Sequence, residues 1–322
     1  MYRRLAAVAA LISLSGSFCA QAQPSYPTKP IRMIVGFTPG SEIDVIGRLV
    51  APELSDRLGQ RVVIDNRSGA GGTVAGAIAA TSSPDGYTLF LNSVAHAASA
   101  ALYPKLPYSP SRDFTPVSQI TSAPNVMIVA PAQGFKTIQE LLAAIRQKPG
   151  QLNFGHAGPG SGTHISGEMF QSAAQIKVIS TGYKGSPELV ADTLTGRIHY
   201  SFSPIGSTIG FLKEKRLVAL AVTTLVRNPL FPDVPTIAES AIPGFEWDQW
   251  YGLFAPARTP RAVVERLSME LSQVLALAGI KDKVGIRGSV TKPSTPEEFA
   301  KYFRAQEERI GKAIREAGIK LN

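Results

Sequence analysis

Residues 31–66 read IRMIVGFTPGSEIDVIGRLVAPELSDRLGQRVVIDN, and the fold class can be predicted from the pattern of this stretch. Its first five residues are mostly apolar, which predicts a buried strand at 31–35. Over 42–58 apolar residues recur at helical spacing, and Gly59 suits the left-handed residue that commonly ends a helix. Pro52 falls inside this helix, where its missing N–H group predicts a kink. The stretch therefore predicts a strand, a loop and a helix that lead into a second strand.

The same alternation continues along most of the chain. Strands are expected at 62–64 and 87–91 with a small-residue helix at 73–80 between them, and this β-α-β-α-β order predicts parallel strands with right-handed crossovers. The pattern then repeats, with expected strands at 126–130, 152–154, 178–181, 198–202, 217–222 and 249–255, and expected helices at 137–147, 164–172 and 187–194. Two long helices follow, after Thr259-Pro260 and from the capping box Thr295–Glu298.

These two groups of units predict two lobes. The chain is expected to cross between them near residues 123–125 and again near 223–228. The first lobe then comprises residues 23–124 and 228–322, and the second comprises residues 125–227. The expected fold class is α/β, in which each lobe is a mostly parallel sheet flanked by helices. Ligands of such sheets bind beyond the carboxyl ends of the strands, which places the expected site in the cleft between the lobes.

Residues 1–22, MYRRLAAVAALISLSGSFCAQA, have the pattern of a secretory signal peptide. Arg3 and Arg4 precede an apolar stretch, and Ala20-Gln21-Ala22 is a small-x-small cleavage site. The apolar stretch is about half the ~20 residues that a membrane-spanning helix needs. We therefore expect export to the periplasm and cleavage after Ala22. Cys19, the single cysteine, leaves with this segment, so no disulfide is expected in the mature chain.

Composition and motifs argue against several classes of function. The chain of 322 residues is 44% hydrophobic, which excludes a disordered protein. Its formal net charge of +9 comes from basic residues that are scattered singly, which argues against nucleic-acid binding. The four histidines lack metal-binding spacing and no nucleotide-binding glycine motif is complete, so no metal or cofactor is expected. One enzymatic alternative remains, a hydrolase that uses Ser161 with His156 or His164, although a Gly-x-Ser-x-Gly motif is missing.

Two loops carry the binding signal, one in each expected lobe. The loops 37–44 and 156–164 each follow a strand, are rich in small polar residues and enter a helix. A helix N-terminus presents unpaired backbone N–H groups and the positive end of the helix dipole. Two such ends that face one another across a cleft would clamp a carboxylate without an arginine. The pair of loops therefore favours anion binding.

A series of short motifs runs through the chain in a fixed order. It consists of Tyr26-Pro27-Thr28-Lys29-Pro30-Ile31, Phe37-Thr38-Pro39-Gly40 with Asp44, Asp65–Gly72, Pro84-Asp85-Gly86-Tyr87-Thr88, Gly158-Pro159-Gly160-Ser161, Tyr183-Lys184-Gly185, Asp233-Val234-Pro235-Thr236 and Trp250–Pro256. This series resembles the Bug family, the periplasmic solute receptors of tripartite tricarboxylate transporters. The resemblance implies a Venus-flytrap fold of the type II kind, a monomer that holds a small carboxylate between its lobes and delivers it to the membrane subunits of the transporter. A periplasmic sensor that docks on a membrane signalling partner is the alternative.

The resemblance also implies a set of ligand-binding residues. By position these are Phe37, Thr38, Pro39, Gly40, Ser41, Glu42, Asp44 and Ser93 in the first lobe, and Ala157, Gly158, Ser161, Thr163, Tyr183 and Asp192 in the second. Asp192 has a second interpretation, in which it holds loops together by hydrogen bonds. No residue in the set is expected to be catalytic or to bind a metal.

Glu42 is a departure from the family pattern. The family usually has Pro-Gly-Gly-Gly-Thr/Ser-Asp where this chain has Pro39-Gly40-Ser41-Glu42-Ile43-Asp44. A Glu42 carboxylate that points into the cleft would repel a multiply charged ligand. We therefore expect a ligand with one recognised carboxylate on an apolar, for example aromatic, body. In the alternative, Glu42 faces solvent and only complements the helix dipole.

Overall fold

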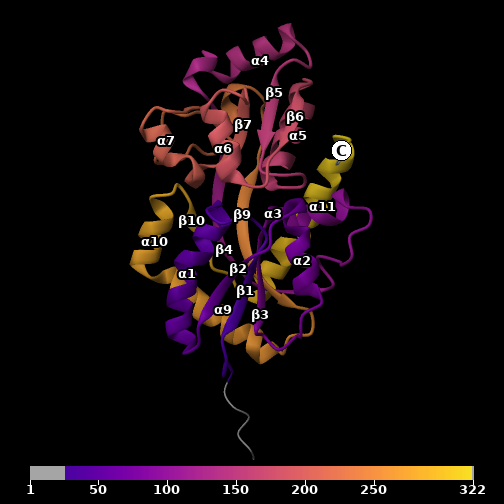
Figure 1. Cartoon of the computed structure of the whole chain (residues 1–322), viewed down its shortest axis with the longest axis vertical. Helices are drawn as coiled ribbons and strands as arrows, with labels where there is room; N and C mark the ends of the chain where they lie inside the picture. The colour runs from indigo at the N-terminus through magenta and orange to yellow at the C-terminus, as the bar shows by residue number, and fades with distance from the viewer. Residues whose placement is uncertain (1–25, 321–322) are drawn as a thin grey trace, which may run out of the picture.

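The computed structural model describes residues 26–320, which form an elongated molecule with two stacked parts (Figure 1). Its strands form one ten-stranded sheet in the order β2-β1-β3-β9-β4-β7-β5-β6, with β8 and β10 also paired to β4. The strand β4 (Phe114–Val129) is long enough to contribute to both parts. We call the part built around β1, β2, β3, β9 and β10 the first half, and the part built around β5, β6, β7 and β8 the second half.

In the first half, parallel pairs come from the local units and antiparallel pairs from distant ones. The strands are β1 (Ile31–Val35), β2 (Val62–Asn66), β3 (Thr88–Ser93), β9 (Asp248–Pro256) and β10 (Val290–Thr291). β1 pairs in parallel with β2 and β3, as its sequence pattern predicts. β9 lies antiparallel between β3 and the first part of β4. The sheet is therefore mixed, because β9 runs antiparallel to both of the strands between which it lies.

The second half repeats this arrangement on a smaller scale. Its strands are β5 (Asn153–His156), β6 (Ile179–Gly182), β7 (Tyr200–Pro204) and β8 (Val218–Val222). β5 pairs in parallel with β6 and β7, whereas β7 and β8 are antiparallel to the second part of β4. The α/β class and the flanking helices are confirmed, and both halves are more mixed than the sequence pattern predicts.

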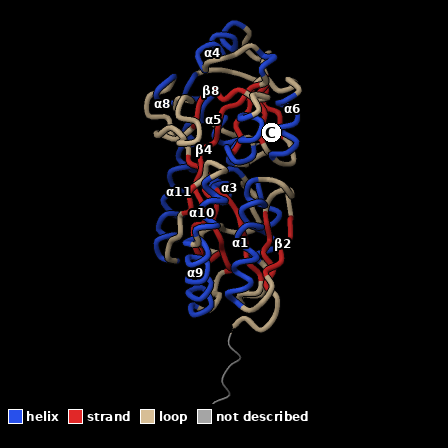
Figure 2. The backbone as a smooth tube through the Cα atoms, turned by 90° about the vertical axis from the view of Figure 1, so that its left-hand side faces the viewer, coloured by secondary structure: helices blue, strands red, loops and turns tan. Residues whose placement is uncertain are grey.

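Helices cover the faces of both halves (Figure 2). Those of the first half are α1 (Glu42–Leu58), α2 (Thr73–Ala80), α3 (Val94–Leu102), α9 (Arg261–Ala276), α10 (Ala278–Gly285) and α11 (Pro296–Glu316). Those of the second half are α4 (Ile138–Gln147), α5 (Gly162–Ala174), α6 (Ser186–Leu194), α7 (Ile209–Lys213) and α8 (Ile237–Ser240). Within residues 26–320, no helix combines the length and the apolar character that crossing a membrane requires.

The apolar core is continuous between the two halves. One cluster of buried side chains includes Phe90 and Phe254 of the first half together with Phe154 and Phe170 of the second. A second cluster joins α1 and α9 to β1 and β3, where Ile46 and Leu271 are fully buried. Burial of apolar side chains is the main favourable term in folding. The chain segments that pass between the halves therefore run beside buried apolar side chains.

The helix α1 illustrates how closely the local pattern determines structure. It spans 42–58, as expected, and Gly59 ends it with φ of 68°. The helix continues through Pro52, so the proline does not end it. Pro52 is exposed, so the Arg48 carbonyl group that loses its usual N–H partner lies on the solvent side of the helix.

Candidate functional site

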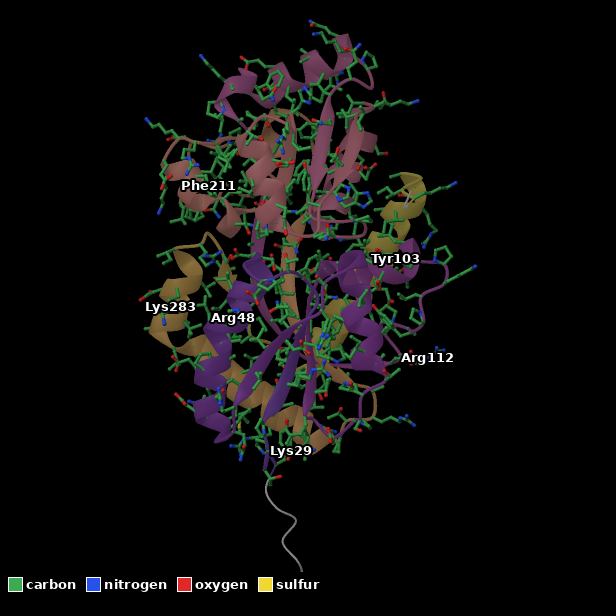
Figure 3. All side chains as sticks on the ribbon, in the orientation of Figure 1. Lys29, Arg48, Tyr103, Arg112, Phe211 and Lys283 are labelled. Atoms are coloured by element: carbon green, nitrogen blue, oxygen red, sulfur yellow. The ribbon has the colours of Figure 1, made fainter. Side chains whose placement is uncertain are left out.

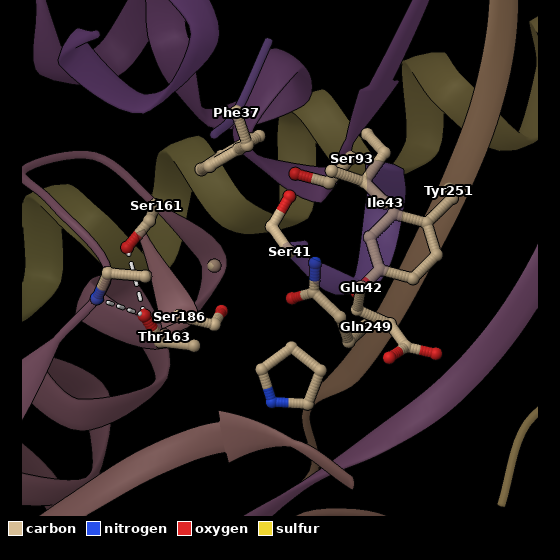
Figure 4. A pocket seen from close by; sticks show the side chains of 13 residues that line it. Phe37, Ser41, Glu42, Ile43, Ser93, Ser161, Thr163, Ser186, Gln249 and Tyr251 are labelled. Carbon is tan, nitrogen blue, oxygen red and sulfur yellow. Dashed lines mark hydrogen bonds between the residues drawn. The ribbon is translucent and has the colours of Figure 1, made fainter. Parts of the chain in front are cut away.

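A small cavity lies where the two halves meet (Figure 4). It is lined by Phe37, Ser41, Glu42, Ile43, Ser93, Ala157, Ser161, Gly162, Thr163, Ser186, Pro204, Gln249 and Tyr251. Its volume of about 20 Å³ leaves room for little more than a water molecule. The structure is therefore a closed arrangement, in which side chains and backbone of the two halves are in contact around the cavity.

Four helices begin at this cavity, two from each half. Ser41, Ser93 and Ser161 are the N-cap residues of α1, α3 and α5, and Ser186 is the first residue of α6. Each helix follows the carboxyl end of a strand, β1, β3, β5 or β6, and β1 is parallel to β3 as β5 is to β6. Parallel strands deliver their carboxyl ends to one edge of a sheet, so the helices that follow begin at the same place. Four positive helix ends therefore face one small volume.

The other lining groups are neutral, apart from Glu42. Hydroxyl groups come from the four serines and Thr163, and an amide comes from Gln249. Ser41 Oγ and Gln249 Oε1 are buried and have no hydrogen-bond partner within the described structure. A buried polar atom without a partner costs free energy, so it marks a place where a ligand atom can complete the hydrogen bonding. The cavity thus offers hydroxyl groups and backbone N–H groups to an anion.

Asp44 holds the loop of the first half in place. Its side chain, 2% exposed, accepts hydrogen bonds from Gly40 N (2.9 Å), Asn66 Nδ2 (2.9 Å) and Arg48 Nε (3.0 Å). Burial alone would raise the pKa of Asp44, but these donors hold its pKa below the usual value. The carboxylate of Asp44 is therefore occupied by protein donors, and it fixes the conformation of the loop 37–41.

Two histidines and a threonine hold the loop of the second half. Thr163 Oγ1 accepts from Ala157 N (2.9 Å), His156 Nδ1 from Gly158 N (3.2 Å) and His164 Nδ1 from Gly160 N (3.2 Å). Burial lowers the pKa of His156 to about 3 and the pKa of His164 to about 4. Both imidazoles are therefore neutral near pH 7, which leaves their Nδ1 atoms free to accept from the loop.

The geometry that the hydrolase alternative requires is not formed around Ser161. Ser161 Oγ accepts from His164 N (3.2 Å) and lies 3.0 Å from Thr163 Oγ1, while Nδ1 of each nearby imidazole is bonded to the backbone. A serine nucleophile needs a base within hydrogen-bond distance of its hydroxyl group. Ser161 therefore acts here as a helix cap. Across residues 26–320, acidic, histidine and cysteine side chains nowhere gather in groups of three or more that would suit a metal ion.

The position of Glu42 excludes the alternative interpretation, in which this residue faces solvent. Its side chain is 1% exposed, so it does not face solvent. Its carboxylate forms an ion pair with Arg287, with Nε 2.9 Å from Oε1. Burial raises the pKa of the Glu42 carboxyl group, although Arg287 opposes this effect. Figure 4 shows the carboxylate near Tyr251, on the side away from Ser161 and Thr163. Glu42 therefore lines the cavity with its charge already paired.

The other expected ligand residues fall into two groups. Gly158 and Tyr183 line a neighbouring groove of about 440 Å³, which also includes Phe37 and Ala157. Thr38, Pro39, Gly40, Asp44 and Asp192 line neither space. Asp192 instead accepts from the Tyr183 hydroxyl group at 2.9 Å, in agreement with its interpretation as a residue that holds loops together.

Several lining residues are not in the expected set. They are Ile43, Gly162, Ser186, Pro204, Gln249 and Tyr251. Ile43 and Gly162 stand at helix starts next to residues that were expected, and Ser186 begins α6 three residues after Tyr183, so the loop-to-helix boundary is the signal that would find them. Gln249 and Tyr251 lie on β9, which reaches the cavity only because it crosses the centre of the sheet.

Comparison with known proteins agrees with this geometry. Residues 46–319 match the family model described as Tripartite tricarboxylate transporter family receptor. The chain is 37% identical to a UPF0065 protein from the tcbD-tcbE intergenic region of Pseudomonas sp. strain P51, over 99% of this chain and 96% of that one. It is 32% identical to the protein BugT of Bordetella pertussis, over 100% of this chain and 99% of that one.

Solved structures share the same fold over nearly the whole chain. The R. palustris protein Rpa4515 with adipate is 32% identical, with a TM-score of 0.88 over 92% of this chain and 100% of that one. MatC from Rhodopseudomonas palustris with bound malate is 29% identical, with a TM-score of 0.86 over 90% of this chain and 100% of that one. The two-part α/β architecture, the cavity at the helix ends and these similarities lead to one conclusion: the chain belongs to the TctC family, the receptors of tripartite tricarboxylate transporters, which includes the Bug proteins.

Proposed function

We propose that the protein captures a small carboxylate between its two halves and delivers it to the membrane subunits of a tripartite tricarboxylate-type transporter. The observation that carries this proposal is the convergence of four helix N-termini on one cavity. Aligned N–H groups stabilise an anion without a cationic side chain. The adipate and malate that two relatives hold in their structures support a carboxylate as the ligand class.

In this proposal the two halves act as lobes that open and close. Their bounds are those expected from the sequence, 23–124 with 228–322 for the first lobe and 125–227 for the second, except that α8 (Ile237–Ser240) packs against α4 and β8 and so moves with the second lobe. Because the closed cavity holds only about 20 Å³, a carboxylate enters while the lobes are apart and is enclosed when they meet. The protein works as a receptor and not as an enzyme, and Ser161 supports this because its hydroxyl group caps α5.

We further propose that the ligand presents one carboxylate to the helix ends and an uncharged body to the other walls. Those walls are apolar, with Phe37, Ile43, Pro204 and Tyr251 around the cavity. The one charged side chain in the lining, Glu42, is paired. A second carboxylate on the ligand would therefore meet apolar side chains instead of a cation, and desolvation of that charge is unfavourable.

A thermal-shift panel tests this function. The probes are adipate, malate, citrate, benzoate, aspartate and the neutral amide benzamide, which serves as the control. An acid at about 100 times its Kd adds about 2.7 kcal/mol of stability, which raises the melting temperature. We expect benzoate to give a larger shift than citrate and benzamide to give none. No shift with any acid would contradict the proposed function, and a larger shift with citrate would contradict the single-carboxylate proposal.

Export to the periplasm is part of the proposal. The signal pattern lies in residues 1–22, outside the residues that the structure describes. Cleavage after Ala22 removes Arg3, Arg4 and Cys19 and leaves Gln23 as the first residue. Mass spectrometry of the protein from a periplasmic extract should find that N-terminus. A mature protein that still begins with Met1 would contradict the proposal.

A further inference from the structure

The ion pair between Glu42 and Arg287 joins three parts of the chain. Glu42 is the first residue of α1, Arg287 follows α10, and Gly206 lies in a short 3-10 turn, Ile205–Ser207, of the second half. Arg287 forms two charge-assisted hydrogen bonds with the Glu42 carboxylate, through Nε and through a terminal nitrogen. The same terminal nitrogen donates to the Gly206 carbonyl oxygen at 2.9 Å. The guanidinium group therefore bridges the two halves beside the cavity.

The place of Glu42 makes this pairing important for an anion. Glu42 stands in the first turn of a helix whose N-terminus faces the cavity, and it is 1% exposed. An unpaired carboxylate there would weaken the positive potential of the helix end and repel a bound carboxylate. Screening by water is weak at such a buried position. The cavity can therefore accept an anion only while the charge of Glu42 is compensated.

We propose that Arg287 is a specificity-determining residue: by neutralising Glu42, and by bonding Gly206 across the two halves, it makes the closed cavity able to hold a carboxylate. Arg287 does not line the cavity, so it acts through Glu42 and is a positioning residue. Its planar guanidinium group suits the task, because it presents parallel N–H groups to a carboxylate and keeps its charge at any physiological pH. This inference rests on the proposed function and adds the residue that sets the charge of the site.

The charged and titratable groups around Glu42 are few. Arg287 faces it from the turn after α10, and Tyr251 faces it from β9. The 3-10 turn at 205–207 contributes the Gly206 carbonyl group. On α1 itself, Asp44 is paired with Arg48. Loss of Arg287 would therefore leave a buried carboxylate with no opposing charge, and such a group takes up a proton at a higher pH than usual.

Titration calorimetry of two variants, from pH 8 to pH 5.5, tests the inference. The probe is whichever acid among adipate, malate, citrate and benzoate gives the wild type its largest thermal shift. Arg287→Met should weaken binding about tenfold or more at pH 8, and the loss should shrink toward pH 5.5 as Glu42 takes up a proton. The double variant Glu42→Gln/Arg287→Met should bind more tightly than Arg287→Met at pH 8 and show no such pH dependence, since both variants lack the bond to Gly206 and differ only in the charge of residue 42.

Further variants keep the inference testable if Arg287→Met does not fold. Glu42→Gln alone leaves Arg287 uncompensated, so it should bind the acid more tightly than the wild type throughout. Arg287→Lys, which keeps the charge, should show the flat pH profile of the wild type. A loss in Arg287→Met that is equal at all pH values, or a Glu42→Gln variant with unchanged affinity, would overturn the inference and leave the proposed function intact. A wild type that binds none of the four acids would overturn both.

Discussion

Two acidic residues in the first turn of α1 show how position decides the role of a side chain. Glu42 and Asp44 are both almost fully buried, yet their partners differ. Asp44 bonds to residues within 22 positions of it in the sequence and fixes a loop, whereas Glu42 pairs with Arg287, 245 positions away. Ser41, beside them, has a buried hydroxyl group with no partner in the described structure. Asp44 and Glu42 therefore serve loop structure and charge balance separately, and the Ser41 hydroxyl group beside them is left for a ligand in the function proposed above.

Replacement of Asp44 by Asn should destabilise the protein. The variant loses the carboxylate to which Gly40, Asn66 and Arg48 donate hydrogen bonds. The free energy of unfolding should therefore fall by about 1–3 kcal/mol. The folded pKa of Asp44 lies below its unfolded value, so the stabilisation is complete above the unfolded pKa and is lost as pH falls through the folded pKa. Urea unfolding at pH 7 and at pH 2.5 checks this. The difference between wild type and variant should narrow at pH 2.5, and an equal difference at both values would contradict the assignment.

Replacement of Ser41 by Ala should affect binding and not stability. Ser41 Oγ caps no N–H group in α1, so its removal costs the free protein little. A bound carboxylate would lose one hydrogen bond to a charged acceptor, about 1.5–3 kcal/mol, or roughly tenfold or more in Kd. Calorimetry and thermal unfolding separate the two effects. Ser93→Ala is the matched comparison at another serine of the cavity. Because Ser93 Oγ accepts from Ala95 N, this variant should lower the melting temperature, whereas Ser41→Ala should not.

At the scale of elements, local units were predictable and long-range strands were not. The strand at 31–35 and the helices at 42–58 and 73–80 have the expected bounds, because strand period, helix period and end signals all lie within a few residues. The long strand β4 was expected only at its end, since polar residues and two prolines interrupt its sixteen residues. Its pairing is supplied by β9, β7 and β8, which lie far away in the sequence.

Seven of the fourteen expected ligand residues line the cavity, and those near helix starts were the most predictable.

A capping box stabilises the start of α11. Thr295 Oγ1 accepts from Glu298 N, and the Glu298 carboxylate accepts from Thr295 N. Thr295→Ala should lower the free energy of unfolding by about 1 kcal/mol, measured by urea unfolding, and leave acid binding unchanged because α11 does not line the cavity. Thr137→Ala, in the equivalent box of α4, is the matched control. A change in acid affinity in either variant would show that the helix ends are coupled to the site.

At the scale of the whole molecule, the two halves meet through backbone contacts around the cavity. The Tyr103 hydroxyl group, near the junction of the halves in Figure 3, donates to the Pro159 carbonyl oxygen at 3.0 Å. Gly185 lies against Thr38, and a Cβ atom at Gly71 would lie 2.8 Å from the Gly160 carbonyl carbon. Such close contacts require small residues, which explains why glycine-rich loops occur in both halves. They also mean that bulk added at the junction should oppose closure.

Gly71→Ala tests this account of closure. The added methyl group would collide with the backbone of Gly160, so the variant should bind the best acid of the panel at least about tenfold more weakly, because closure then costs free energy. Gly59→Ala is the matched control. The φ of Gly59, 68°, is similar to that of Gly71, but no atom lies within 4 Å of the new Cβ position at Gly59. Calorimetry gives the affinities, and small-angle scattering gives the compaction on binding. Equal losses in both variants would assign the effect to backbone strain and contradict the closure account.

We expect the cavity to bind a carboxylate at the four helix N-termini. The most direct test is a crystal structure of the mature protein with the acid that gives the largest thermal shift. It should show one carboxylate group among Ser41, Ser93, Ser161 and Ser186, within about 3 Å of Ser41 Oγ and of first-turn backbone N–H groups. The Glu42–Arg287 pair should stay intact beside the acid. An acid bound elsewhere, or bound with its carboxylate turned away from the helix ends, would show that the helix N-termini are not the binding site.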